Sequence, residues 1–89
     1  MTDFVSLEGP LENIDGKLVL RIPLEAGGNK LALFARGIGE IENDYLKVII
    51  QPWLAEKLRV SADSLVIVDN KNGKFNITRS AANDALKKS

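Results

Sequence analysis

The chain of 89 residues contains neither cysteine nor histidine. These two absences exclude thiol nucleophiles, disulfide bonds, imidazole general bases and the common zinc sites. The groups left for catalysis are carboxylates, lysines, one tyrosine and hydroxyls, few of which can be tuned to act near neutral pH. We therefore expect a protein that is not an enzyme and that holds no cofactor and no metal ion.

The sequence also lacks long hydrophobic runs, and we expect no secretory signal. No apolar stretch approaches the roughly 20 residues that a membrane-spanning helix requires, and no basic segment followed by an apolar one opens the chain. We therefore expect a single domain over residues 1–89, located in the cytoplasm and without membrane contact. Because so short a domain has a modest core, we expect a homodimer or a protein partner.

The charges sum to zero but are unevenly spread. Residues 1–45 carry four basic and eight acidic side chains, whereas residues 46–89 carry eight basic and four acidic ones. A basic half can bind nucleic acid, and the candidate phosphate contacts are Lys47, Arg59, Lys71, Lys74 and Arg79. The favoured interpretation is that the two halves attract each other within the fold or across a dimer, because a dedicated DNA-binding protein usually carries a positive net charge.

Turn residues and apolar alternation predict the secondary structure. Turns are expected at Gly9-Pro10, Asp15-Gly16, Asn43-Asp44 and Asn72-Gly73. Strands are expected near residues 17–24, 45–50, 65–69 and 74–78, with residues 40–42 pairing with the second of them, and short helices near 52–58 and 80–88. Residues 30–36 fit either a strand or a helix that Asn29 caps and Gly37 ends; the helix is favoured.

A faint internal repeat bears on the architecture. A shift of 29 residues aligns Val19 with Val48, Leu20 with Ile49, Pro23 with Pro52 and Ala26 with Ala55. Duplicated strand–turn–strand units close naturally into small pseudo-symmetric barrels. We therefore expect a mainly β, β-rich α+β domain, as a small barrel or a swapped-hairpin-like module, with a degenerate duplication of about residues 17–45 and 46–79.

The segment from Val48 to Val68 runs through a strand, a proline, a short helix and a second strand. It resembles the AbrB/MazE-type swapped-hairpin module and its relatives among the cradle-loop barrels. Arg59 stands where that family favours glycine, and Asp63-Ser64 replaces its Gly-Asp turn. The resemblance implies an intertwined dimer and a DNA-binding regulator or antitoxin.

Few other residues are candidates for a site. Trp53, next to Pro52, fits partial core packing and an interface anchor equally well. Glu40, Glu42 and Asp44 alternate along a predicted strand, where they could bind a hard cation, but a solvated edge strand is favoured. The glycine-rich segments 27–30 and 37–39 are interpreted as a flexible connection and a bend rather than as phosphate or dinucleotide sites.

Three functions follow, in order of preference. The first is a non-catalytic interaction module, dimeric or bound to a protein partner through Trp53 and the helix that begins at Pro52. The second is an AbrB-like DNA-binding regulator that uses the basic half. The third is a carboxylate-based cation-binding protein or enzyme.

Overall fold

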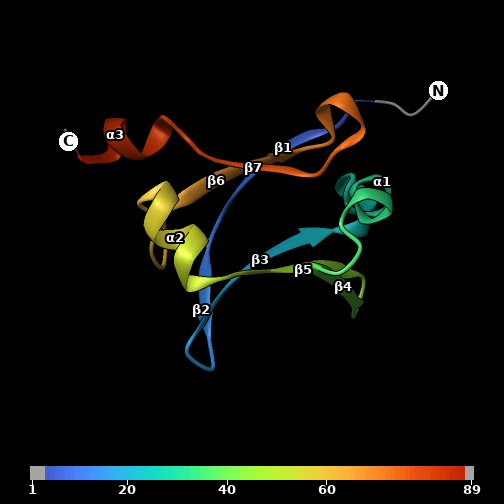
Figure 1. Cartoon of the computed structure of the whole chain (residues 1–89), viewed down its shortest axis with the longest axis horizontal. Helices are drawn as coiled ribbons and strands as arrows, with labels where there is room; N and C mark the ends of the chain where they lie inside the picture. The colour runs from blue at the N-terminus through green and yellow to red at the C-terminus, as the bar shows by residue number, and fades with distance from the viewer. Residues whose placement is uncertain (1–3, 88–89) are drawn as a thin grey trace.

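The computed structural model describes residues 4–87 and contains two antiparallel sheets. The three-stranded sheet has the order β1-β6-β7, and the four-stranded sheet has the order β2-β3-β5-β4. Their bounds are β1 (Ser6–Pro10), β2 (Glu12–Ile14), β3 (Lys17–Pro23), β4 (Gly39–Glu42), β5 (Tyr45–Ile50), β6 (Leu65–Asp69) and β7 (Asn76–Arg79). The sheets face each other in two layers (Figure 1).

Short helices lie at the ends of the sheets. They are α1 (Gly28–Leu31), α2 (Pro52–Leu58) and α3 (Ala82–Lys87), and three 3-10 turns accompany them: η1 (Leu24–Ala26), η2 (Ala32–Phe34) and η3 (Lys71–Gly73). Figure 1 shows α1 at one end of the sheets and α2 at the other. The mainly β, α+β prediction is thus confirmed. The end of the predicted last helix at Lys88 lies outside the described residues.

The barrel prediction is wrong, because no hydrogen-bonded ladder joins the two sheets among the described residues. β2 pairs only with Lys17–Val19 of β3, whereas β1, which precedes it in the chain, pairs with β6. The chain changes direction between these two strands at a single residue, Leu11. The Leu11 N–H donates to the carbonyl of Ser64, and its own carbonyl accepts from the N–H of Asp63. The bend is therefore held by backbone bonds, and it places β1 and β2 in different sheets.

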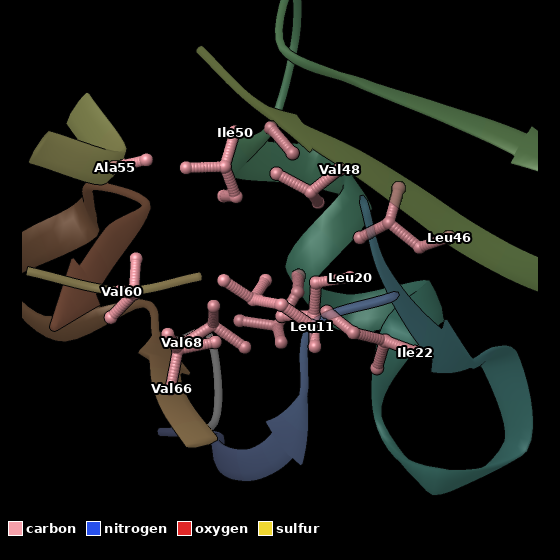
Figure 2. Packing of buried hydrophobic residues seen from close by; sticks show 12 residues of the cluster. Leu11, Leu20, Ile22, Leu46, Val48, Ile50, Ala55, Val60, Val66 and Val68 are labelled. Carbon is pink, nitrogen blue, oxygen red and sulfur yellow. The ribbon is translucent and has the colours of Figure 1, made fainter. Parts of the chain in front are cut away.

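The core fills the space between these layers. It includes Leu20 and Ile22 from β3, Leu46, Val48 and Ile50 from β5, Val66 and Val68 from β6, and Leu31 from α1, with Leu11 at the bend (Figure 2). Alternate positions of each strand point inward, as the period of two requires. Leu54 and Leu58 of α2 pack against the same cluster, as predicted.

The four-stranded sheet contains two hairpins in matching register. The pair Glu12–Val19 of the first corresponds to the pair Glu40–Lys47 of the second, a shift of 28 residues (12 to 40 and 19 to 47). The repeat aligned from the sequence had a shift of 29 residues. Because successive residues of a strand point to opposite faces, an odd shift matches a side chain that points into the core with one that points away from it. The even shift pairs the buried Leu20 and Ile22 with the buried Val48 and Ile50. The duplication itself stays a prediction.

Two predicted hairpin turns are confirmed. Asp15-Gly16 and Asn43-Asp44 each join two strands directly, and all four residues have φ between 50° and 82°. Left-handed conformation at both central positions matches the right-handed twist of the strands, and Asn, Asp and Gly tolerate it best.

Three local predictions are wrong. Gly9-Pro10 is not a turn but the end of β1, where proline is acceptable because β1 is an edge strand. Asn29 does not cap α1, which begins at Gly28 with Gly27 in the cap position. Asn72-Gly73 does not form a two-residue turn. It lies within a six-residue loop, residues 70–75, because the last pair of the β6–β7 hairpin is Asp69–Asn76.

Candidate interaction surface

Trp53 occupies the first turn of α2, and its side chain is 66% exposed. Pro52 begins the helix, where its fixed φ is favourable and its missing N–H costs nothing. The helix begins one residue after β5, so Trp53 lies beside the end of this strand, at the surface of the protein. Of the two interpretations of Trp53, partial core packing is therefore excluded, and a surface position is established.

The outer face of the four-stranded sheet continues the apolar surface toward β4. Ile49 of β5 and Ile38, which precedes β4, are 37% and 48% exposed. A hollow of about 410 Å³ is lined by both isoleucines together with Gly37, Gly39, Glu40, Lys47 and Gln51. A second hollow of about 330 Å³ shares Ile49 and Gln51 and reaches Pro52. We call Ile38, Ile49, Pro52 and Trp53 the apolar rim.

Only two of the four residues of the apolar rim were predicted from the sequence. Pro52 and Trp53 were selected, but Ile38 and Ile49 were not. Alternation in β5 contained the signal for Ile49, since Leu46, Val48 and Ile50 are buried and Lys47 and Ile49 must point the other way. Ile38 could not be recognised, because its exposure depends on the turn that brings the chain from η2 to β4.

Two ion pairs lie on the outer face of the four-stranded sheet. Arg21 forms a two-pronged ion pair with Glu12, with Nε–Oε1 and Nη2–Oε2 distances of 3.0 and 3.1 Å. Its guanidinium carbon also lies 5.2 Å from the centroid of the Tyr45 ring. Lys47 binds Glu42 at 3.3 Å. This last pair joins the adjacent strands β4 and β5 of one hairpin, and exposed pairs of this kind contribute only about 0–1 kcal/mol. The attraction between the two halves of the chain stays a prediction.

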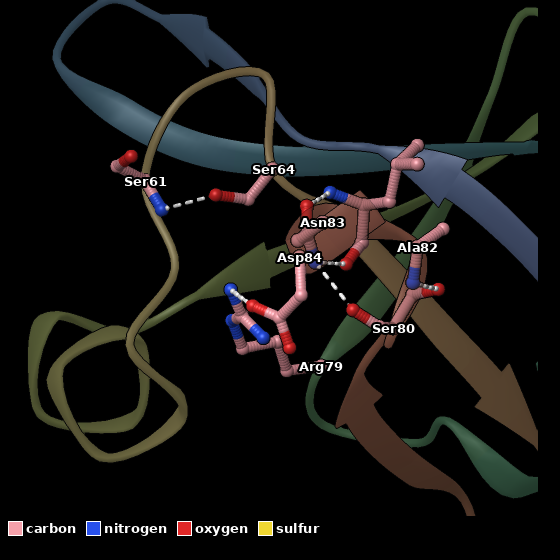
Figure 3. Close-up of polar contacts among 8 residues, drawn as sticks. Ser61, Ser64, Arg79, Ser80, Ala82, Asn83 and Asp84 are labelled. Carbon is pink, nitrogen blue, oxygen red and sulfur yellow. Dashed lines mark hydrogen bonds and ion pairs between the residues drawn. The ribbon is translucent and has the colours of Figure 1, made fainter. Parts of the chain in front are cut away.

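The five candidate phosphate contacts do not lie together. Lys47 is on the outer face of the four-stranded sheet, whereas Lys71 and Lys74 are in the loop between β6 and β7, at the end of β6 away from α2 (Figure 1). Arg59 follows α2, and Arg79 is paired with Asp84 at 3.0 Å (Figure 3). Lys71 and Lys74 are neighbours in that loop, at the opposite end of β7 from Arg79, so the five residues are spread over different parts of the fold.

The three candidate cation ligands do not form a common site. Glu40 and Glu42 share one face of β4, and Glu42 is occupied by Lys47, while Asp44 lies in the hairpin turn with φ of 66°. Within residues 4–87, no group of three or more acidic side chains is arranged to hold a metal ion. The carboxylates are placed as the charged side chains of an edge strand.

The segment 37–39 includes the predicted bend, whereas the segment 27–30 is not the predicted flexible connection, because Gly28, Asn29 and Lys30 begin α1. Residues 36–38 form a turn, in which the N–H groups of Ile38 and Gly39 both donate to the carbonyl of Ala35. Gly27, with φ of 122°, connects η1 to α1.

No family model, no curated protein and no solved structure matches the chain. None of the helices in the described part of the chain has the length and hydrophobicity to cross a membrane.

Proposed function

We propose that the chain is a non-catalytic interaction domain that associates with a second copy of itself through the apolar rim. The observation that carries the proposal is the exposure of Trp53, the largest side chain in the protein, on a short helix held against the sheet. Tryptophan is among the residues most enriched at the energetic centres of interfaces. A cytoplasmic location is part of the same proposal, since a chain without cysteine needs no oxidising compartment.

The charges indicate which surface can take part. If two β4 edges paired around a two-fold axis, Glu40 of one copy would lie opposite Glu42 of the other. Like charges directly opposite each other in a sheet are destabilising. The contact is therefore assigned to the rim beside α2 and not to the β4 edge.

Light scattering over a range of concentrations tests this proposal. At micromolar concentration we expect twice the monomer mass of 9.7 kDa. Trp53→Ala should raise the dissociation constant by roughly 30-fold, because interface tryptophans contribute about 2 kcal/mol or more. Phe4→Ala is the matched control, since Phe4 is 65% exposed but lies outside the rim. A monomer at high concentration, or equal effects of the two substitutions, contradicts the proposal.

A second candidate function is an AbrB-like DNA-binding regulator. The observation that favours it is the backbone conformation of Arg59 and Asp63, whose φ values are 58° and 72°. These are the two positions at which that family has glycine, the residue best suited to positive φ. A positive φ at both positions supports this second proposal.

Titration of duplex DNA at several salt concentrations separates the two functions. With its basic residues dispersed, the chain should bind no more tightly than the non-specific range of about 10⁻⁴ to 10⁻⁶ M at physiological salt. A salt-sensitive nanomolar complex that Lys71→Glu with Lys74→Glu abolishes would place the regulator first.

A further inference from the structure

The loop between β6 and β7 contains the chain's single Asn-Gly pair, Asn72-Gly73, and both residues are exposed. This pair can modify itself. The backbone nitrogen of Gly73 attacks the side-chain carbonyl carbon of Asn72, a succinimide ring forms and ammonia leaves. Water then opens the ring to aspartate or isoaspartate. Glycine favours the attack because it has no side chain to obstruct the nitrogen and restricts the backbone least.

The conformation of the loop opposes this reaction. Asn72 has φ of 60° and ψ of 26°, which places the Gly73 nitrogen and the Asn72 side chain on nearly opposite sides of the Cα–C bond. The Gly73 N–H also donates to the carbonyl of Asn70 at 3.2 Å. Ring closure therefore requires a large rotation of this peptide and the loss of that hydrogen bond.

A second asparagine keeps the loop in this conformation. The Nδ2 of Asn76 donates to Oδ1 of Asp69 at 2.8 Å and to the carbonyls of Lys71 and Lys74 at 3.1 and 3.0 Å. The same Asp69 oxygen accepts from the N–H of Lys71 at 3.0 Å. Asn76 thus ties the base of the hairpin to the backbone on both sides of the Asn-Gly pair.

We propose that Asn72 is a deamidation site and that the Asn76 amide is the latch that protects it. While the latch is closed, the Gly73 nitrogen cannot reach the side chain. When the loop opens, Asn72 becomes an acid and the charge of residues 70–75 falls from +2, supplied by Lys71 and Lys74, to +1. The modification would weaken the one place where two of the candidate phosphate contacts are neighbours.

Ageing the purified chain in mildly alkaline buffer, with peptide mapping by mass spectrometry, tests the proposal. Deamidation at Asn72 should be at least about 10-fold slower in the native protein than in concentrated urea, because several hydrogen bonds must break for the loop to open. Asn76→Ala in native buffer should remove most of this difference. Gly73→Ala should suppress the reaction in both solvents.

Asn13→Ala is the control, because Asn13 also accepts a backbone hydrogen bond in an exposed turn, from the N–H of Gly16, and should leave the rate at Asn72 unchanged. Circular dichroism establishes that each variant is folded. Equal rates in native buffer and urea overturn the proposal without any variant. An Asn76→Ala protein that is folded but reacts at the native rate, or modification at another asparagine first, overturns it as well.

Discussion

Asn83→Ala should destabilise the protein strongly, although Asn83 lies in the short C-terminal helix. Asn83 is only 8% exposed, and its side-chain amide bonds both the N–H and the carbonyl of Leu65, the first residue of β6, as a neighbouring strand would (Figure 3). Oδ1 accepts from the N–H of Leu65 at 2.7 Å, and Nδ2 donates to the carbonyls of Leu65 and Ser80 at 2.8 and 2.7 Å. The substitution removes all three bonds at once.

The expected cost follows from which groups lose their partners. Both carbonyls keep one bond, to the backbone N–H groups of Ser80 and Asn83, but the Leu65 N–H loses the Oδ1 of Asn83 as its acceptor. Leaving this part-buried donor without an acceptor costs about 2 kcal/mol, the middle of the usual range of about 1–3 kcal/mol, and each of the other two bonds contributes only about 0.5 kcal/mol because its carbonyl keeps a partner. Alanine offsets roughly 0.6 kcal/mol through its higher helix propensity. We therefore expect a net loss of about 2–3 kcal/mol in the free energy of unfolding.

Urea unfolding followed by far-ultraviolet circular dichroism measures this loss, since the exposed indole of Trp53 is a poor reporter of folding. In thermal unfolding the same change should lower Tm by roughly 8–24 °C, at about 4–8 °C per kcal/mol for a domain of this size. Asn29→Ala is the matched control, because Asn29 is an exposed helical residue. A loss below about 0.5 kcal/mol, or one no larger than that of the control, would refute the assigned role of Asn83.

Three further substitutions test the fold by urea unfolding. Leu20→Ala, at 2% exposure in the core, should cost about 2–5 kcal/mol, whereas Leu33→Ala at 62% exposure should cost under about 0.5 kcal/mol; similar losses would contradict the core assignment. Arg59→Gly should stabilise the protein by about 0.5–1 kcal/mol, because Arg59 ends α2 with φ of 58°, and Arg59→Ala should bring no such gain. Gly28→Ala should cost about 1–3 kcal/mol, since the new Cβ would lie 2.8 and 2.9 Å from two carbonyl oxygens of β3; an unchanged stability would disprove this contact.

Local chemistry was enough to predict most of the secondary structure. The Asp15-Gly16 and Asn43-Asp44 turns, the helix that begins at Pro52 and the strands β3, β5 and β6 were all predicted, because each depends on neighbouring residues. Ser80 also caps the last helix as expected, with its Oγ accepting from the N–H of Ala82. Alternation and turn propensity act over a few residues, so the sequence reveals them directly.

The N-terminal strands show where local reasoning failed. Residues 6–10 have little apolar alternation, and Gly9-Pro10 is typical of a turn. They form β1 only because β6, more than 50 residues later, offers them an edge to pair with. A pairing partner so distant in the chain leaves no mark on the local pattern.

The order of residues was enough to predict a β-rich domain without cysteine or histidine, and most of its elements, including the hairpin turns at Asp15-Gly16 and Asn43-Asp44. The tertiary structure alone decided that the strands form two layers and not a barrel, because the bend at Leu11 is held by backbone bonds to Asp63 and Ser64. It also decided that Trp53 is exposed and that the basic residues lie apart. These properties depend on how segments that are distant in the sequence pack against one another, so no local pattern of residues predicts them.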